Sequence, residues 1–192
     1  MRIFISLYFI FISLLSFCQR SPLAPNIRKL KNDTIIWKPD SLLRPEDFKA
    51  KPKSNGPLGL SYVGFLYYTN ESNGELILNV EAIFVKSKSY IVKNTEYVLK
   101  HEQIHFDIAE LHARRLRKRI DEVDFKRIKS MQNEINKLHE KTVKEYNKEQ
   151  EEYDKDTEHG LNAAKQKVWN EKIQAAIKEL DKYSAFTVDI TN

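Results

Sequence analysis

The hydrophobic and polar positions divide the chain into a strand-rich first half and a helical second half. Residues 60–69 and 75–86 are rich in aromatic and β-branched residues, and turn-forming residues lie between them at 70–74. This pattern predicts a β-hairpin, because such residues favour pleated, half-buried strands and Asn-Gly pairs favour tight turns. Shorter strands are predicted at 34–38 and 186–190. The pattern therefore predicts an α+β fold that begins with a small N-terminal sheet.

The second half of the chain carries helical periodicity. A first helix is predicted from Thr95 to about Arg119, because Thr95 can cap it and apolar residues recur within it every three or four positions. A second, long and strongly charged helix is predicted from about 128 to 153. Gly160 then interrupts the pattern, and a third helix is predicted over 168–180. The predicted architecture is a small sheet followed by three helices.

The first residues have the pattern of a targeting signal. Arg2 is followed by an uncharged and mostly apolar run over residues 3–17. This run is shorter than the roughly 20 residues of a membrane span, so it predicts a signal peptide over 1–18. An alternative is a lipoprotein signal, in which Cys18 becomes the lipidated first residue, and another is an uncleaved anchor. We therefore predict an exported protein, periplasmic or secreted, with a flexible lead-in at 19–33 and a folded domain at 34–192.

Charge and cysteine content narrow the chemistry. The net charge is +5 from 32 basic and 27 acidic residues, which is too mild an excess to indicate nucleic-acid binding on its own. Cys18 is the only cysteine, so the chain forms neither an internal disulfide nor a thiolate zinc site. Any metal must be held by histidines and carboxylates. The basic run at 114–119 is expected to be a solvated helix face, with peripheral contact to the anionic cell envelope as the alternative.

His101-Glu102-Gln103-Ile104-His105 is an HExxH motif inside the first predicted helix. Two histidines four residues apart lie on one helix face, so both imidazoles can bind one Zn²⁺ ion. Glu102 projects beside them, where it can take a proton from a zinc-bound water. The motif therefore predicts His101 and His105 as metal ligands and Glu102 as the general base of a metallopeptidase.

The motif does not supply a third ligand. His112 lies two helical turns beyond His105, which is too far to share the metal. A tight antiparallel helix hairpin would bring His139 level with the motif. His159 stands before Gly160, and from residue chemistry alone it is explained equally well as a ligand or as part of a helix C-cap.

A second group of residues, combined with the motif, carries a resemblance. These residues are Tyr153-Asp154, Thr157, His159-Gly160, Gln166 and Trp169, together with Phe106 to Glu110 after the motif, Trp37 and the Glu46-Asp47-Phe48 turn. On them the chain resembles, over roughly 34–181, the bacterial family catalogued as domain of unknown function 922, whose members are regarded as zinc-dependent proteases. The resemblance implies a zincin-like fold and metal-dependent peptide hydrolysis. It favours His159 as the third ligand, with Asp154 as the alternative, and it implies no particular substrate.

Together these inferences give a hypothesis for function. The protein is expected to be an exported zinc metallopeptidase in which Zn²⁺ is held by His101, His105 and His159 and Glu102 activates a zinc-bound water. A peptide or protein is the expected substrate, and nucleic acid is not an expected partner. Tyr153 is a candidate oxyanion donor, with a packed aromatic as the alternative. The competing class is a non-catalytic exported binding or scaffold protein of the cell envelope, with a structural metal or none.

Overall fold

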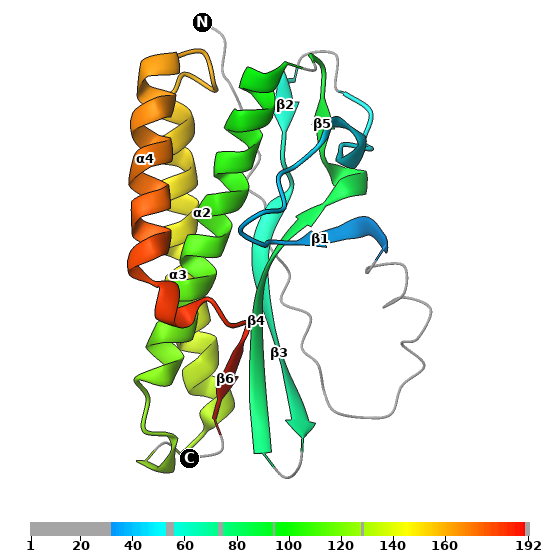
Figure 1. Cartoon of the computed structure of the whole chain (residues 1–192). Coiled ribbons are helices and arrows are strands. Elements are labelled where there is room, and N and C mark those ends of the chain that lie inside the picture. The colour runs from blue at the N-terminus through cyan, green and yellow to red at the C-terminus, as the bar shows by residue number, and fades with distance from the viewer. Residues whose placement is uncertain (1–31, 53–55, 73–74, 94, 128, 191–192) are drawn as a thin grey trace, which may run out of the picture.

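The computed structural model describes residues 32–190, apart from 53–55, 73–74, 94 and 128. A small antiparallel sheet lies on one side and three long helices cover one of its faces, so the fold is α+β (Figure 1). The predicted signal peptide at 1–18 and most of the lead-in at 19–33 lie outside the described residues. Among the residues that are described, none of the helices combines the length and apolar character needed to cross a bilayer.

Strand β4 is the centre of the sheet. It pairs with β3 along one edge and with β1 and β6 at the two ends of its other edge, all antiparallel. A separate antiparallel pair, β2 with β5, lies above the main sheet in Figure 1. The strands are β1 (Thr34–Ile36), β2 (Gly59–Leu60), β3 (Val63–Ser72), β4 (Glu75–Val85), β5 (Tyr90–Ile91) and β6 (Thr187–Asp189).

The predicted hairpin is confirmed, but its bounds differ from the prediction. Residues 70–72 were expected in the turn, whereas they continue β3 and pair with 75–77 of β4. Pairing along the ladder outweighs the weak strand preference of Asn70 and its neighbours. Leu60 belongs to β2 rather than to the hairpin, and its partner is Tyr90. The turn named above at Glu46-Asp47-Phe48 is a single 3₁₀ turn over Pro45–Asp47.

All three predicted helices are present. They are α2 (Glu96–Asp121), α3 (Met131–Asp156) and α4 (Ala163–Glu179). Thr95 caps α2 as expected, since its side chain accepts a hydrogen bond from Val98 N at 3.2 Å. The α4 helix begins earlier than its apolar residues suggested, because Asn162 caps it by accepting from Lys165 N.

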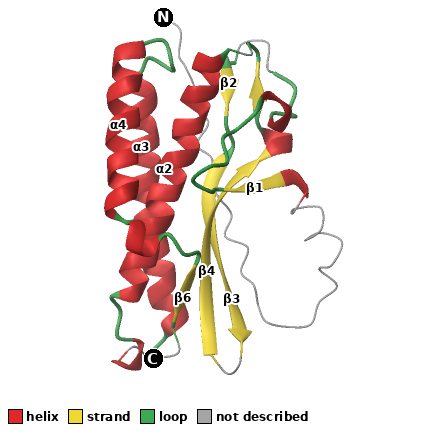
Figure 2. Ribbon diagram, viewed as in Figure 1, coloured by secondary structure: helices red, strands yellow, loops and turns green. Residues whose placement is uncertain are grey.

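Helix α2 packs against the sheet and against both other helices, while α3 also contacts β3 (Figure 2). Phe106, Ile108 and Leu116 on this helix are fully buried in the apolar core. Because α2 is covered on both sides, Arg114 and Arg117 are buried as well. The expectation that the basic run at 114–119 is a solvated face is therefore wrong for these two arginines, which pair with the buried carboxylate of Glu110.

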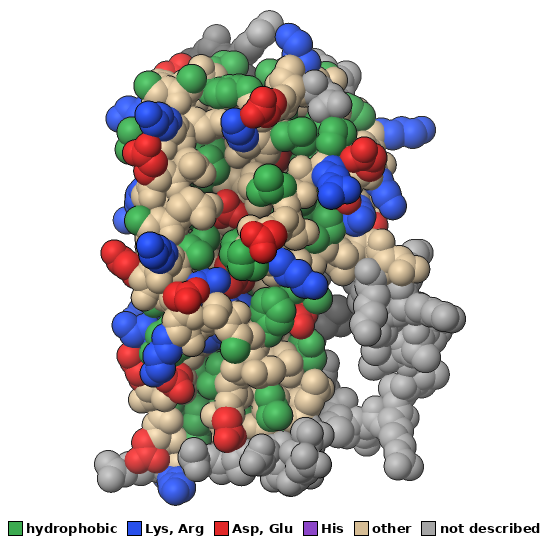
Figure 3. Space-filling view, viewed as in Figure 1, with side chains coloured by type: hydrophobic (Ala, Val, Ile, Leu, Met, Phe, Trp, Pro, Cys, Tyr) green, Lys and Arg blue, Asp and Glu red, His purple; other side chains and the backbone are tan. Residues whose placement is uncertain are grey.

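The side of the molecule that Figure 3 presents carries charges of both signs. Figure 3 shows Lys and Arg side chains interspersed with Asp and Glu over this face. The small excess of basic residues is therefore not gathered into one patch on the side that the figure presents.

A polar cluster joins the three helices. Glu149 of α3 lies 3.0 Å from His112 Nε2 of α2, 2.7 Å from Arg115 Nη1 of α2 and 3.0 Å from Lys172 Nζ of α4. Burial opposes ionisation of Glu149, but these three partners outweigh it and hold the pKa of Glu149 well below its usual range. His112, which lies too far from His105 to share a metal, thus has a structural role in this cluster.

Acid should weaken this cluster. A carboxylate whose folded pKa is depressed contributes stability that is complete above its unfolded pKa, about 4.3, and is lost as the pH falls through the folded pKa. We expect the free energy of unfolding to decrease below pH 4.5, with Glu149 accounting for on the order of 1–2 kcal/mol. Urea unfolding at pH 7, 4.5 and 3 measures this. Glu149→Gln should flatten the pH dependence and Glu140→Gln, at an exposed site on α3, should not. Equal slopes for the parent and Glu149→Gln would contradict the assignment.

Candidate metal centre

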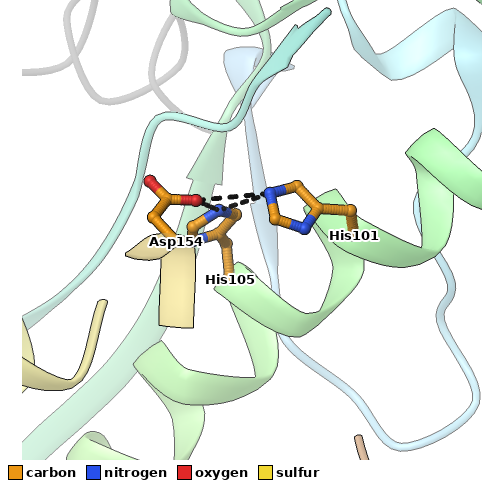
Figure 4. A group of neighbouring side chains, drawn as sticks. All are labelled: His101, His105 and Asp154. Atoms are coloured by element: carbon orange, nitrogen blue, oxygen red, sulfur yellow. Dashed lines mark hydrogen bonds and ion pairs between the residues drawn. The ribbon is translucent and has the colours of Figure 1, made fainter. Parts of the chain in front are cut away.

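Three side chains from two helices converge beside the sheet. His101 and His105 extend from α2, and Asp154 extends from the last turn of α3 toward them (Figure 4). Asp154 Oδ1 lies 3.3 Å from His101 Nε2 and 3.1 Å from His105 Nε2, and the two Nε2 atoms are 3.2 Å apart. Among the described residues this is the one group of three or more His, Cys, Asp or Glu donors close enough to hold an ion.

The spacing of these donors fits a tetrahedral zinc ion. Zinc bonds of 2.0–2.1 Å at tetrahedral angles place two ligand atoms about 3.3 Å apart. The three observed separations, from 3.1 to 3.3 Å, agree with this value. Two imidazoles and one carboxylate are also the chemical types that zinc accepts. His101, His105 and Asp154 are therefore a suitable three-ligand set.

The antiparallel packing of α3 on α2 determines which α3 residue reaches the motif. Arg119 near the end of α2 contacts Thr142 and Glu145, while His105 contacts Gln150. One turn beyond Gln150, Asp154 comes level with the two histidines. Their Nδ1 atoms contact other side chains, Gln150 for His105 and both Gln166 and Tyr153 for His101.

The cluster is electrostatically coupled. Burial acts to lower the pKa of His105, but the adjacent Asp154 carboxylate outweighs it and raises this pKa to about 9. Burial likewise opposes ionisation of Asp154, yet His105 and His101 hold the pKa of that carboxyl well below its usual range. Asp154 is therefore a carboxylate at neutral pH, the form in which it can bind a cation.

Glu102 lies beside the cluster in a cavity of about 500 Å³. The residue is buried, and its Oε2 has no hydrogen-bond partner among the described residues. Gly59 of β2 packs directly against the carboxyl group: a Cβ at position 59 would lie 2.3 Å from Glu102 Oε1. A buried carboxylate oxygen without a partner is costly, so its presence here indicates a function.

The structure does not bring His159 into the group. It places His159 at the cavity edge, with a side chain that is 71% exposed and an Nδ1 atom 3.6 Å from Asp154 Oδ2. Glu158, His159 and Gly160 all have positive φ, at 53°, 54° and 81°. This left-handed turn ends α3, as His159 N donates to Asp154 O at 2.8 Å. Gly160 then packs on the His101 ring, where a Cβ would lie 3.0 Å from Cγ.

The other candidate side chains lie elsewhere. His139 is placed between Phe65 and Tyr67, with ring centroids 5.6 and 5.1 Å away, and it contributes no donor to the cluster. Tyr153 is fully buried and its hydroxyl lies 2.8 Å from His101 Nδ1, the ring nitrogen that does not face Asp154. Tyr153 is therefore a packed aromatic that contacts His101 on the side away from Asp154, and it is not placed as an oxyanion donor.

A comparison with known protein families finds a match to the part of the chain that carries this cluster. Residues 92–160 match the family described as bacterial protein of unknown function (DUF922). The match covers 69 of the 192 residues, so it shows a likeness of this segment to the DUF922 family. The DUF922 match is shorter than the span of 34–181 over which the resemblance was expected. No curated protein and no solved structure matches the chain.

The DUF922 region contains α2, α3 and the left-handed turn, and thus every donor of the cluster. Two neighbours of the site lie outside the matched region, namely Gly59, which packs on Glu102, and Gln166, which contacts His101. The roles of Gly59 and Gln150 were not predicted from the sequence. Gln166 had a signal, as one of the residues on which the resemblance to DUF922 proteins rests.

Proposed function

We propose that this protein is a zinc-dependent peptidase with a zincin-like active site. The observation that carries the proposal is the buried carboxylate of Glu102, whose Oε2 has no hydrogen-bond partner among the described residues. This carboxylate shares a cavity with three donors that could hold a metal ion. Catalytic zinc sites use three protein ligands and keep one position open, whereas structural sites use four. An HExxH glutamate beside such a set is typical of metallopeptidases. Export through a signal peptide remains a prediction.

His101, His105 and Asp154 would hold the ion. When bound, zinc supplies a Lewis acid that polarises a peptide carbonyl and lowers the pKa of water to about 7. Glu102 accepts one proton from the attacking water, whose oxygen bonds to the carbonyl carbon. Glu102 then passes that proton to the nitrogen of the breaking C–N bond, which leaves as an amine. Gly59 limits the positions open to the carboxylate, because it packs on Oε1.

Metal content tests the ligand set. The purified protein, loaded with zinc and freed of excess, should hold about one zinc ion per chain by elemental analysis. His101→Ala, His105→Ala and Asp154→Ala should each lose it, because two ligands of this kind bind zinc weakly. His159→Ala and the control His139→Ala should retain it. Zinc lost from His159→Ala but kept in Asp154→Ala would restore the ligand set expected from the resemblance.

Hydrolysis tests the activity. The zinc-loaded protein should cleave members of a quenched fluorescent peptide library, a chelator should abolish cleavage, and added zinc should restore it. A protein that holds zinc in a chelator-resistant form and cleaves none of the library would instead support the non-catalytic binding or scaffold class.

A further inference from the structure

Two glutamine side chains contact the histidine pair on the side that faces away from Asp154. Gln150 of α3 contacts His105, with Oε1 2.5 Å from Nδ1 and Nε2 donating to the His105 carbonyl oxygen at 2.9 Å. Gln166 of α4 contacts His101, with Oε1 3.2 Å from Nδ1 and Nε2 donating to the Tyr97 carbonyl oxygen at 3.4 Å. Each amide thus bridges an imidazole and a backbone carbonyl of α2.

The carbonyl contacts determine the orientation of both amides. A backbone carbonyl only accepts hydrogen bonds, so the amide nitrogen must face it and the amide oxygen must face Nδ1. The amide oxygen in turn only accepts, so Nδ1 must carry the proton. A neutral imidazole with its proton on Nδ1 has its lone pair on Nε2. Both Nε2 atoms are the ones that face Asp154.

Tyr153 makes the assignment for His101 depend on Gln166. The Tyr153 hydroxyl lies 2.8 Å from His101 Nδ1 and 3.2 Å from the His101 carbonyl oxygen, so by itself it could donate to either. If it donated to Nδ1, that nitrogen would be unprotonated and would face the Gln166 oxygen with two lone pairs opposed. Gln166 excludes this arrangement, and the hydroxyl proton goes to the carbonyl.

We propose that Gln150 and Gln166 are positioning residues that fix both histidines as Nδ1–H tautomers and so present two Nε2 lone pairs to one zinc ion. This inference rests on the proposed function for its metal, and it assigns a role to two residues that the HExxH motif does not contain. Metal-bound histidines often donate to a carboxylate instead. Here a neutral amide performs that task, without adding a negative charge behind either ring.

Zinc affinity of the full chain tests the proposal. Dissociation constants would be measured at one fixed pH by competition with a chromophoric chelator, for the parent and for leucine and glutamate variants at each position. Gln150→Leu and Gln166→Leu should each weaken zinc binding by about 10–100-fold, as the loss of such a partner usually does. Gln150→Glu and Gln166→Glu keep an acceptor for Nδ1–H and should bind zinc at least as tightly as the parent. Gln132→Leu, at an exposed site on α3, is the matched control and should leave the zinc affinity unchanged.

A measurement on the unaltered protein guards against variants that fail to fold. In the zinc-loaded parent with ¹⁵N-labelled histidine, NMR should find the ring proton of both His101 and His105 on Nδ1. A ring proton on Nε2 of either histidine, or unchanged affinity in both leucine variants, would overturn the positioning role while leaving the peptidase proposal standing. Glutamate variants as weak as the leucine variants would also overturn it. A parent that binds no zinc would instead overturn the proposed function itself.

Discussion

Replacing Glu102 by glutamine is expected to leave the zinc content at about one ion per chain and to slow peptide hydrolysis by about 10²–10⁴-fold, the usual contribution of a general base. Glutamine has nearly the shape of glutamate but does not accept a proton from water at neutral pH. The three proposed zinc donors belong to other side chains, so the metal should remain. Elemental analysis and initial rates on one peptide that the parent cleaves measure the two effects together.

Two companion variants sharpen this test. Gly59→Ala should reproduce the loss of hydrolysis with zinc retained, because the added Cβ would overlap Glu102 Oε1 and displace the carboxylate. Glu96→Gln makes the same chemical change at an exposed site in the first turn of α2 and should hydrolyse the peptide at the parental rate. If Glu102→Gln retained the parental rate, Glu102 would not be the base, and the mechanism proposed above would be wrong.

The sequence was sufficient to predict the part of the site that lies on one helix. Helical periodicity places His101 and His105 one turn apart whatever surrounds them, and the structure brings both into the cluster. The third donor depends on the register between α2 and α3, which the intervening segment and the side-chain packing determine. A slip of one turn would present Gln150 in place of Asp154. Residue types alone do not resolve such a difference.

The placement of His159 shows a second limit. Its neighbour Gly160 signals a helix end, but a positive φ at two successive residues other than glycine, here Glu158 and His159, is uncommon. Here both do so, and the resulting turn places the His159 side chain at the edge of the cavity and lets Gly160 pack on His101. The turn therefore depends on the packing around His101. This packing cannot be predicted from the pattern of residues along the chain.

Burial of charge was the largest departure from expectation in the fold. Basic residues late in a helix are normally solvated, and Lys118 is. Arg114 and Arg117 instead face elements that cover α2: Arg114 donates to the carbonyl oxygen of Ile177, and Arg117 to those of Val80 and Tyr183. Glu110 is the only carboxylate that pairs with both guanidinium groups among the described residues, which makes it a sensitive point of the fold.

Glu110→Gln is therefore expected to lower the free energy of unfolding by about 3–5 kcal/mol, the cost of breaking a buried ion pair from one side. Glu110 is fully buried, its Oε1 accepts from Arg114 Nε at 2.9 Å and from Arg117 Nη1 at 3.0 Å, and its Oε2 accepts from Arg117 Nη2 at 3.3 Å. Glutamine keeps the volume but removes the charge. The two buried guanidinium groups are then left with carbonyl oxygens and, for Arg114 alone, the exposed carboxylate of Asp181 at 3.4 Å. The midpoint of urea unfolding for the zinc-free protein measures this loss.

The matched control is Glu145→Gln, which weakens the ion pair with Arg119 on the surface between α2 and α3. That pair is partly exposed, so its loss should cost less than about 1 kcal/mol. Both variants make the same chemical change opposite an arginine, so the comparison measures what burial and the second arginine add. If the two midpoints shifted equally, the Arg114–Glu110–Arg117 cluster would not be the anchor that its burial implies, and the backbone carbonyls of Val80, Ile177 and Tyr183 would be sufficient to hold the two arginines in the core.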